Sequence, residues 1–272
     1  MAVTKFQREI WSKKIQDDLE LKTKLVDNCT REYEGDCELA KTVRILGVGE
    51  PTIGAYTGED ITIEAMSDKD QTLNIDQANY FAFEVKDIDK AQSVPGLPEK
   101  YQEKAVHGLA VKRDTYVANL IKAGTNVTTA AGRTQANIKT AIDNAIVALR
   151  ERNFDGSGVI EITPAVYNIF KNNLIELSTN NPELIKKGVV GMYDNYTVIM
   201  SNNLAVDPST EASRYIYCAV RSKNAIAFAG QINEVEAGRM EKRFSDYVRG
   251  LDTFGAKTIA NDELQVVKIP LA

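Results

Sequence analysis

The sequence predicts an α+β fold. Apolar residues alternate with polar ones along several segments, which is typical of strands with one buried face. Three longer stretches instead space their apolar residues three to four positions apart, which is typical of amphipathic helices. Strands and helices do not follow one another in the regular order of a parallel α/β sheet, so a mixed architecture is favoured. With 272 residues, the chain can form one large domain or two small ones.

The composition is that of a soluble protein with a sizeable core, since 43% of the residues are hydrophobic and 26% are charged. The net charge is −5 and no basic stripe stands out, which disfavours a dedicated DNA-binding domain. Cys29, Cys37 and Cys218 form no CxxC pair, so free thiols in a reducing compartment are expected. The charged N-terminus is unlike a signal peptide, and no apolar run approaches the ~20 residues of a membrane span. We therefore expect a soluble protein that is made in the cytosol.

The first predicted element is an amphipathic helix. Residues 4–26 place Trp11 and other apolar side chains at mostly helical spacing among many charges. This helix docks either on a neighbouring molecule or on its own core, and the second interpretation is at least as favoured. A strand is predicted next, at residues 42–48.

A projecting β-hairpin is predicted after a Gly-rich segment. One arm alternates Ile61 and Ile63 with polar residues. The other arm does the same with Leu73 and Ile75, and residues 67–70, "SDKD", provide the turn between them. An isolated two-stranded hairpin is marginally stable in water, so this one should rest on another surface.

The second arm is expected to continue into a core strand. The alternation of apolar residues extends through Phe81 and Phe83, and it is more than twice as long as the usual five or six residues of a strand. We therefore expect this ribbon to divide at about residue 77, with the projecting hairpin before it and the core sheet after it.

Two longer helices are predicted in the middle of the chain. Residues 98–122 would form a helix of about 37 Å at 1.5 Å per residue. Residues 134–152 form the second, with Thr134 as its N-cap. The later elements are shorter: a helix that begins at Thr163–Pro164, a turn at Asp194–Asn195 and a last strand at 264–269.

No catalytic, cofactor or metal site is predicted. His107 has no nucleophile partner nearby in the sequence, and a solvated helix histidine is favoured. The segment 47–52, "GVGEPT", has Thr52 where a dinucleotide-binding loop has its third glycine, and no helix follows it. Asp87 and Asp89 share one face of a strand but have no third ligand, so a solvated face or a salt bridge to another subunit is favoured.

Two segments and the order of the elements carry a resemblance. The segments are "LNIDQANYFAFEVKDIDKAQS" and "AIAFAGQINEVEAGRMEKRFSDYVRGLDTFGAKTI". The order is a charged arm, a projecting hairpin, an alternating strand, a long helix and a mixed domain. From residue 1 to about 268, the chain resembles the major capsid proteins of tailed bacteriophages, whose fold is shared with encapsulins and the herpesvirus capsid floor. The resemblance implies an N-terminal arm (1–41), an extended loop hairpin with its base (42–78), a peripheral domain with a spine helix (79–133), an axial domain (134–235) and strands that return to the peripheral domain (236–272).

The resemblance also implies a structural protein and not an enzyme. Subunits of this family assemble through pentamers and hexamers into an icosahedral shell, which encloses double-stranded DNA without sequence-specific binding. The implied location is the virion capsid, after synthesis in the host cytoplasm, with scaffolding, portal and decoration proteins as further candidate partners and with no cofactor or membrane. The alternative is an encapsulin-like compartment shell that encloses cargo enzymes. A third interpretation is a soluble adaptor or enzyme subunit with an unrelated α+β fold.

In this family the extended loop lies across the neighbouring subunit of the same ring, and the N-terminal arm reaches sideways. The implied inter-subunit contacts are therefore Ile61, Ile63, Lys69, Leu73, Ile75 and Trp11. Some relatives join a lysine of the loop covalently to an asparagine of a neighbour. Lys69 is the only lysine near the predicted tip, although a solvated turn lysine is the favoured interpretation.

Overall fold

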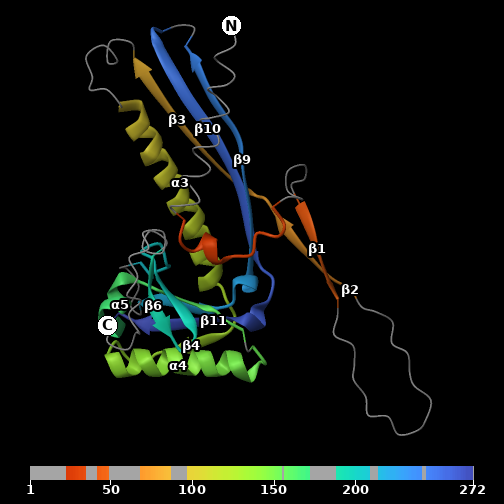
Figure 1. Ribbon diagram of the computed structural model, residues 1–272, viewed down its shortest axis with the longest axis vertical. Coiled ribbons are helices and arrows are strands. Elements are labelled where there is room, and N and C mark those ends of the chain that lie inside the picture. The colour runs from red at the N-terminus through yellow and green to blue at the C-terminus, as the bar shows by residue number, and fades with distance from the viewer. Residues whose placement is uncertain are drawn as a thin grey trace, which may run out of the picture.

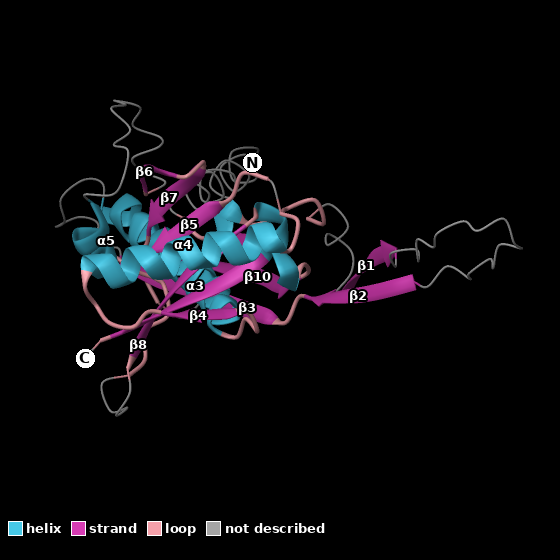
Figure 2. Ribbon diagram, turned by 90° about the horizontal axis from the view of Figure 1, so that it is seen from below, coloured by secondary structure: helices cyan, strands magenta, loops and turns pink. Residues whose placement is uncertain are grey.

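The computed structural model describes residues 23–34, 42–48, 68–86, 97–154, 156–171, 188–208, 214–240 and 243–271. They form an elongated molecule with a compact base and a three-stranded sheet that rises from it beside a long helix (Figure 1). A two-stranded hairpin projects to one side of this body, as Figure 2 shows from below. The predicted α+β class is confirmed.

The base contains a six-stranded sheet with the strand order β4-β11-β8-β5-β7-β6. Its strands are β4 (Val127–Thr129), β5 (Val159–Ile162), β6 (Val189–Tyr193), β7 (Tyr196–Met200), β8 (Tyr215–Arg221) and β11 (Leu264–Pro270). All four residues of β5 and all but the first of β8 are buried. Such continuous burial indicates that both faces of the sheet are covered.

Two helices, α4 (Gln135–Glu151) and α5 (Pro164–Phe170), pack on one face of this sheet. The Thr134 side chain accepts a hydrogen bond from the Asn137 N–H at the start of α4. Thr163 caps α5 in the same way and is followed by Pro164. Both predicted helix starts are confirmed, because the signals that mark them lie within a few residues of the helix itself.

The opposite face is covered by the C-terminal half of α3 (Leu97–Lys122) and by a short 3₁₀ turn, η1 (Val26–Asn28). Leu25, Val117 and Ile121 are fully buried there. The long helix predicted at 98–122 is confirmed. Residues 25 and 26 were expected at the end of an amphipathic helix, but Val26 begins the 3₁₀ turn. Both side chains pack in the core of this subunit, which agrees with the interpretation that this end docks on its own core.

The three-stranded sheet is antiparallel and consists of β3 (Gln77–Lys86), β10 (Ser245–Thr258) and β9 (Ile226–Arg239), in that order. The N-terminal half of α3 lies along one face, where Val106, Leu109 and Ala110 are buried with Val248. Phe81 and Phe83 of β3 pack against this cluster and are half-buried. The alternation in the sequence is therefore a strand with one face on α3 and one face in solvent.

The projecting hairpin consists of β1 (Thr42–Val48) and β2 (Asp68–Asn74), paired antiparallel with Val48 opposite Asp68. The predicted strand at 42–48 is confirmed. The predicted turn at 67–70 is wrong, because residues 68–70 are paired with residues 46–48. Apolar residues further along both strands fix the register, and this outweighs the low strand propensity of aspartate and lysine. The other predicted arm, with Ile61 and Ile63, lies outside the described residues.

The division of the ribbon near residue 77 is confirmed. β2 ends at Asn74 and β3 begins at Gln77, and the two strands belong to different sheets. The domain bounds stay a prediction. Of the two strands within residues 236–272, β10 pairs with β3, and β11 lies between β4 and β8 in the six-stranded sheet. Its two faces are apolar and buried in different clusters, so it is a central strand of the base.

Candidate assembly site

Leu73 anchors the projecting hairpin to the body of its own subunit. Its side chain is fully buried in a cluster with Val43 and Ile45 of β1 and with Ala227 and Ala229 of β9. The apolar sides of both hairpin strands therefore meet the start of β9. Beyond this root, the ribbon extends away from the body (Figure 2).

Two hydrogen bonds also join the hairpin root to the end of β10 and to Ile259, which follows it. Gln71 donates a hydrogen bond from Nε2 to the backbone oxygen of Ile259 at 3.0 Å. The Lys257 ammonium donates to the backbone oxygen of Thr72 at 3.0 Å. Apolar burial and hydrogen bonds thus act together, so the hairpin leaves the subunit in a defined direction.

The burial of Leu73 corrects one expectation about subunit contacts. With none of its side chain exposed, Leu73 offers no surface to another subunit and acts as an internal anchor. Ile75 is half-buried beside the same cluster. Lys69 lies in β2 opposite Gly47, not in a turn. The remaining predicted contacts, Trp11, Ile61 and Ile63, fall outside the described residues.

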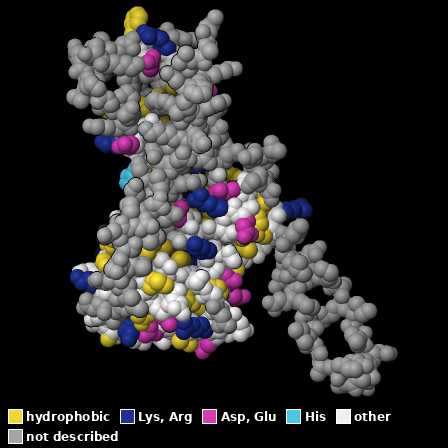
Figure 3. All heavy atoms as spheres, viewed as in Figure 1, with side chains coloured by type: hydrophobic (Ala, Val, Ile, Leu, Met, Phe, Trp, Pro, Cys, Tyr) yellow, Lys and Arg dark blue, Asp and Glu magenta, His cyan; other side chains and the backbone are white. Residues whose placement is uncertain are grey.

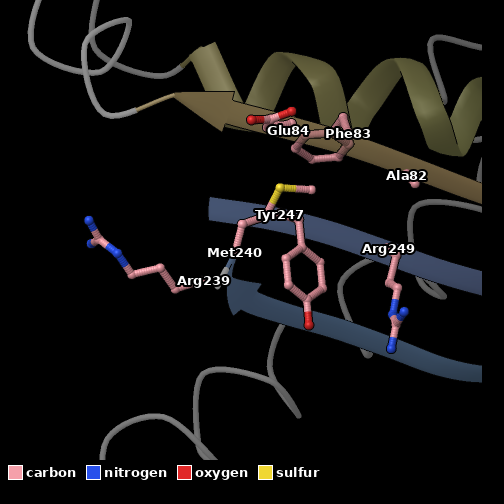
Figure 4. A pocket seen from close by; sticks show the side chains of 7 residues that line it. All are labelled: Ala82, Phe83, Glu84, Arg239, Met240, Tyr247 and Arg249. Carbon is pink, nitrogen blue, oxygen red and sulfur yellow. The ribbon is translucent and has the colours of Figure 1, made fainter. Parts of the chain in front are cut away.

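The outer face of the three-stranded sheet, opposite α3, is exposed and partly apolar. Tyr80 of β3 is 80% exposed, and its cross-strand partner Leu251 of β10 is 40% exposed. A hollow of about 670 Å³ opens on this face (Figure 4). It is lined by Ala82, Phe83, Glu84, Arg239, Met240, Tyr247 and Arg249, although the Phe83 ring itself packs toward α3.

Paired charges accompany these apolar groups. Arg249 donates from Nε to a carboxylate oxygen of Glu236 at 2.7 Å, and its guanidinium lies 5.5 Å from the centre of the Tyr247 ring. Figure 4 shows Tyr247 and Arg249 pointing the same way from β10. Exposed aromatic and arginine side chains are enriched where proteins meet, so this face has the composition of a contact surface.

A buried carboxylate fixes the turn at η1. Asp114 of α3 accepts hydrogen bonds from the backbone N–H groups of Lys24, Leu25 and Val26 at 3.1 to 3.3 Å. Burial raises the pKa of Asp114, while hydrogen bonds from the Asn203 side chain and these amides lower it and offset part of the rise. The carboxylate therefore satisfies N–H groups that have no partner inside the turn.

A buried guanidinium holds the other end of this turn. Arg221 of β8 donates to the backbone oxygens of Asn28 at 2.6 Å and Leu25 at 3.1 Å. It also donates to both carboxylate oxygens of Glu161, at 2.8 and 3.1 Å, and both side chains are fully buried. Burial by itself would lower the pKa of Arg221, but its interactions with Glu161 and Cys29 together outweigh this effect and raise it.

A second buried ion pair joins α3 to the three-stranded sheet. Arg113 donates from Nε to Asp252 of β10 at 3.1 Å, and its guanidinium lies 5.6 and 5.8 Å from the ring centres of Phe228 and Phe254. Sequence reasoning missed this pair and the contacts of Asp114 and Arg221. Arg113 lies within the apolar stripe of the predicted helix, which was a usable signal, but nothing in the sequence pointed to a partner 139 residues away.

In the part of the chain that the structure describes, the residues considered as catalytic or metal-binding candidates do not come together in one site. His107 is exposed on α3. Among the described residues, no three His, Cys, Asp or Glu side chains come together as metal ligands would, and no helix is long and apolar enough to cross a membrane. Cys29 and Cys218 are free and buried. Asp87 and Asp89 lie outside the described residues.

No protein-family model and no curated protein matches this sequence. Solved structures match it over most of its length. A chain of Mycobacterium phage Che8 has a TM-score of 0.73 and 24% identity, with 90% of each chain covered. The capsid structure of cyanophage P-SCSP1u has a TM-score of 0.67 and 16% identity, with 85% of this chain and 84% of that chain covered. The fold is that of a phage capsid protein.

The capsid fold confirms the resemblance drawn from the order of elements and the two quoted segments. A virus-like particle from Pyrococcus furiosus is also similar, with a TM-score of 0.58 and 12% identity, and 96% of this chain and 99% of that chain are covered. The structural neighbours named here therefore come from two phages and from a virus-like particle.

Proposed function

We propose that this chain is the major capsid protein of a tailed bacteriophage. It assembles through pentamers and hexamers into an icosahedral shell that encloses double-stranded DNA. Its role is structural and not catalytic. The subunit is made in the host cytoplasm and ends in the virion, with scaffolding, portal and decoration proteins as candidate partners.

The projecting hairpin is the observation that carries this proposal. Among the described side chains of the hairpin, those at its root, around Leu73, pack on the subunit's own body, and the paired strands β1 and β2 extend away from it (Figure 1). Two strands alone are marginally stable in water and present unpaired edges. A neighbouring copy would cover them. Because each copy gives one hairpin and receives one, the contact is heterologous, and such contacts form a ring when the rotation from copy to copy closes on itself.

The charge distribution supports the role of a container wall. The net charge is −5, and on the face in Figure 3 the described acidic and basic side chains are interspersed and not gathered into a basic patch. Tight, sequence-independent DNA binding requires many phosphate contacts from lysine and arginine. A wall of this kind encloses DNA without holding it strongly.

An encapsulin-like shell that encloses cargo enzymes is the second candidate. This candidate is supported by the Pyrococcus furiosus virus-like particle, because the structural match covers 96% of this chain and 99% of that chain. The two candidates share the same assembly and differ in their contents. Double-stranded DNA in native particles supports the capsid, and an enclosed enzyme supports the compartment.

A shortened hairpin tests the proposal. Val48 pairs with Asp68, so residues 49–67 can be replaced by Asn-Gly, which closes antiparallel strands in a two-residue turn. We expect this variant to keep the circular dichroism spectrum and melting temperature of the wild type. We also expect it to form no shells in negative-stain electron microscopy under conditions in which the wild type forms them. Normal shells from the shortened chain would contradict the proposal.

A further inference from the structure

Gly255 of β10 lies directly beneath the root of the hairpin. A Cβ atom added at Gly255 would overlap the backbone oxygen of Asn74 and would lie 2.9 Å from its carbonyl carbon and 3.0 Å from the Cα atom of Ile75. These are backbone atoms, so they cannot swing aside as a flexible side chain can. The chain thus crosses β10, between the end of β2 and the start of β3, at a point with no room for a side chain.

Gly255 is part of a flat surface of small residues. It pairs with Ala229 of β9, and the next pair on the same face joins Lys257 to Ala227. Ala227 and Ala229 are fully buried against Leu73. We call Ala227, Ala229 and Gly255 the seat, because the hairpin root rests on them.

The hydrogen bonds from Gln71 to Ile259 and from Lys257 to Thr72 bind the root at the seat. The hairpin root is therefore a fixed joint: small residues set how closely it approaches, and polar contacts on neighbouring residues hold it there. A larger residue in the seat would have to tilt or lift β2 as a whole.

We propose that Gly255 sets the direction in which the hairpin leaves the subunit and, through it, the curvature of the shell. The second part rests on the proposed function. In a closed assembly the same contact is repeated by every copy, so a small change of angle at one joint accumulates around the ring.

Gly255→Ala first tests, in the single subunit, whether Gly255 sets the direction of the hairpin. Spin labels are placed on Asp68→Cys at the far end of β2 and on Lys139→Cys of α4, and the distance between them reports the direction of the hairpin. Both substitutions are made in a Cys37→Ser background, because Cys29 and Cys218 are buried. Labelled chains are diluted into unlabelled ones, so that only pairs within one chain contribute. Because Asp68 lies about 20 Å beyond Asn74 along the strand, a small tilt moves its label by several ångströms.

We expect Gly255→Ala to shift this distance while the melting temperature stays within a few degrees of the wild type. We expect its shells to differ in diameter or to remain open in cryo-electron microscopy. Gly108→Ala is the matched control, because a Cβ at Gly108 meets no atom within 4 Å apart from the nearby backbone of its own helix, and it should change neither the distance nor the shells.

If Gly255→Ala does not fold, Ala229→Val enlarges the same seat and should shift the same distance. An unchanged distance in whichever variant folds overturns the role of Gly255. A shifted distance with shells of wild-type diameter overturns the link to curvature. If the wild type forms no shells at all, the proposed function fails, and the distance still decides whether Gly255 directs the hairpin.

Discussion

Asp114 and Arg221 bind opposite ends of one short turn. The carboxylate accepts hydrogen bonds from the N–H groups of Leu25 and Val26, and the guanidinium donates to the backbone oxygens of Leu25 and Asn28. The N–H groups at the start of a turn lack partners within it, so a carboxylate fits there. Arg221 binds the Asn28 carbonyl at the end of the turn, and also the Leu25 carbonyl, which accepts the Asn28 N–H within the turn. The turn thereby joins α3 to the six-stranded sheet.

Arg221→Met should lower the free energy of unfolding by about 3–5 kcal/mol, because it leaves the Glu161 carboxylate buried and unpaired. Urea unfolding measures this change. Arg249→Gln is the control, since its ion pair with Glu236 is exposed, and it should cost less than about 1 kcal/mol. Similar decreases in the free energy of unfolding of the two variants would show that the buried ion pair contributes no more to stability than the exposed one.

Asp207→Asn should destabilise the subunit at neutral pH but not in acid. Burial tends to raise the pKa of Asp207, but hydrogen bonds from Lys122 and from the Tyr215 N–H outweigh it, so the pKa is lowered from its ordinary 3.8. The stability that this group contributes is present above 3.8 and is lost as the pH falls through the lowered folded pKa. We expect a deficit of about 2 kcal/mol at neutral pH, since hydrogen bonds to charged groups contribute about 1.5–3 kcal/mol. A deficit that persisted in acid would contradict this assignment.

Asp114→Asn should show the opposite pH dependence. Burial raises the pKa of Asp114, so the folded state binds a proton more tightly than the unfolded state. Its contribution to stability therefore grows as the pH falls from above the raised pKa toward the ordinary value. Asparagine does not titrate, so the wild type should gain stability over the variant across this range. Urea midpoints measured side by side at several pH values check this, and parallel curves would exclude it.

Cys29 and Cys218 should resist thiol reagents in the native subunit. Burial raises the pKa of Cys29 to about 11 and that of Cys218 to about 12, so little reactive thiolate is present near neutral pH. In a Cys37→Ser variant, we expect Ellman's reagent to label no thiol in the folded protein and two after denaturation in urea. Rapid labelling of the folded variant would contradict the burial of these two thiols.

Leu73→Ala should lower the free energy of unfolding by about 2–5 kcal/mol, because it removes a fully buried side chain from the hairpin root. Tyr80→Ala is the control, since Tyr80 is 80% exposed, and its effect should stay within about 0.5 kcal/mol. Thermal and urea unfolding of both variants give the comparison. Wild-type stability in Leu73→Ala would mean that the root is not part of the core.

The elements predicted correctly are those whose sequence signals, such as an N-cap residue, lie within a few residues of the element itself. Thr134 and Thr163 mark helix starts because a cap and its partner amide are three residues apart. The pairing of β2 with β1 was missed, since the turn-like residues 67–70 gave a strong local signal and the true partner lies across the hairpin. The position of β11 was missed for the same reason, because strand order depends on contacts between distant segments.

The candidate site was less predictable than the fold. The projecting hairpin was expected, but its internal anchor at Leu73 was not, because alternation cannot tell which surface covers an apolar face. The role of Gly255 likewise depends on a backbone atom of Asn74, 181 positions earlier in the chain, and single-sequence patterns carry no such information.

Self-association of the purified full-length chain tests the shell proposal most directly. Sedimentation velocity across protein concentration and salt, followed by cryo-electron microscopy of the fastest species, measures both size and arrangement. We expect closed rings of five or six copies and hollow shells in which the hairpin of each copy lies on its neighbour. A strictly monomeric protein under all of these conditions would contradict the proposal.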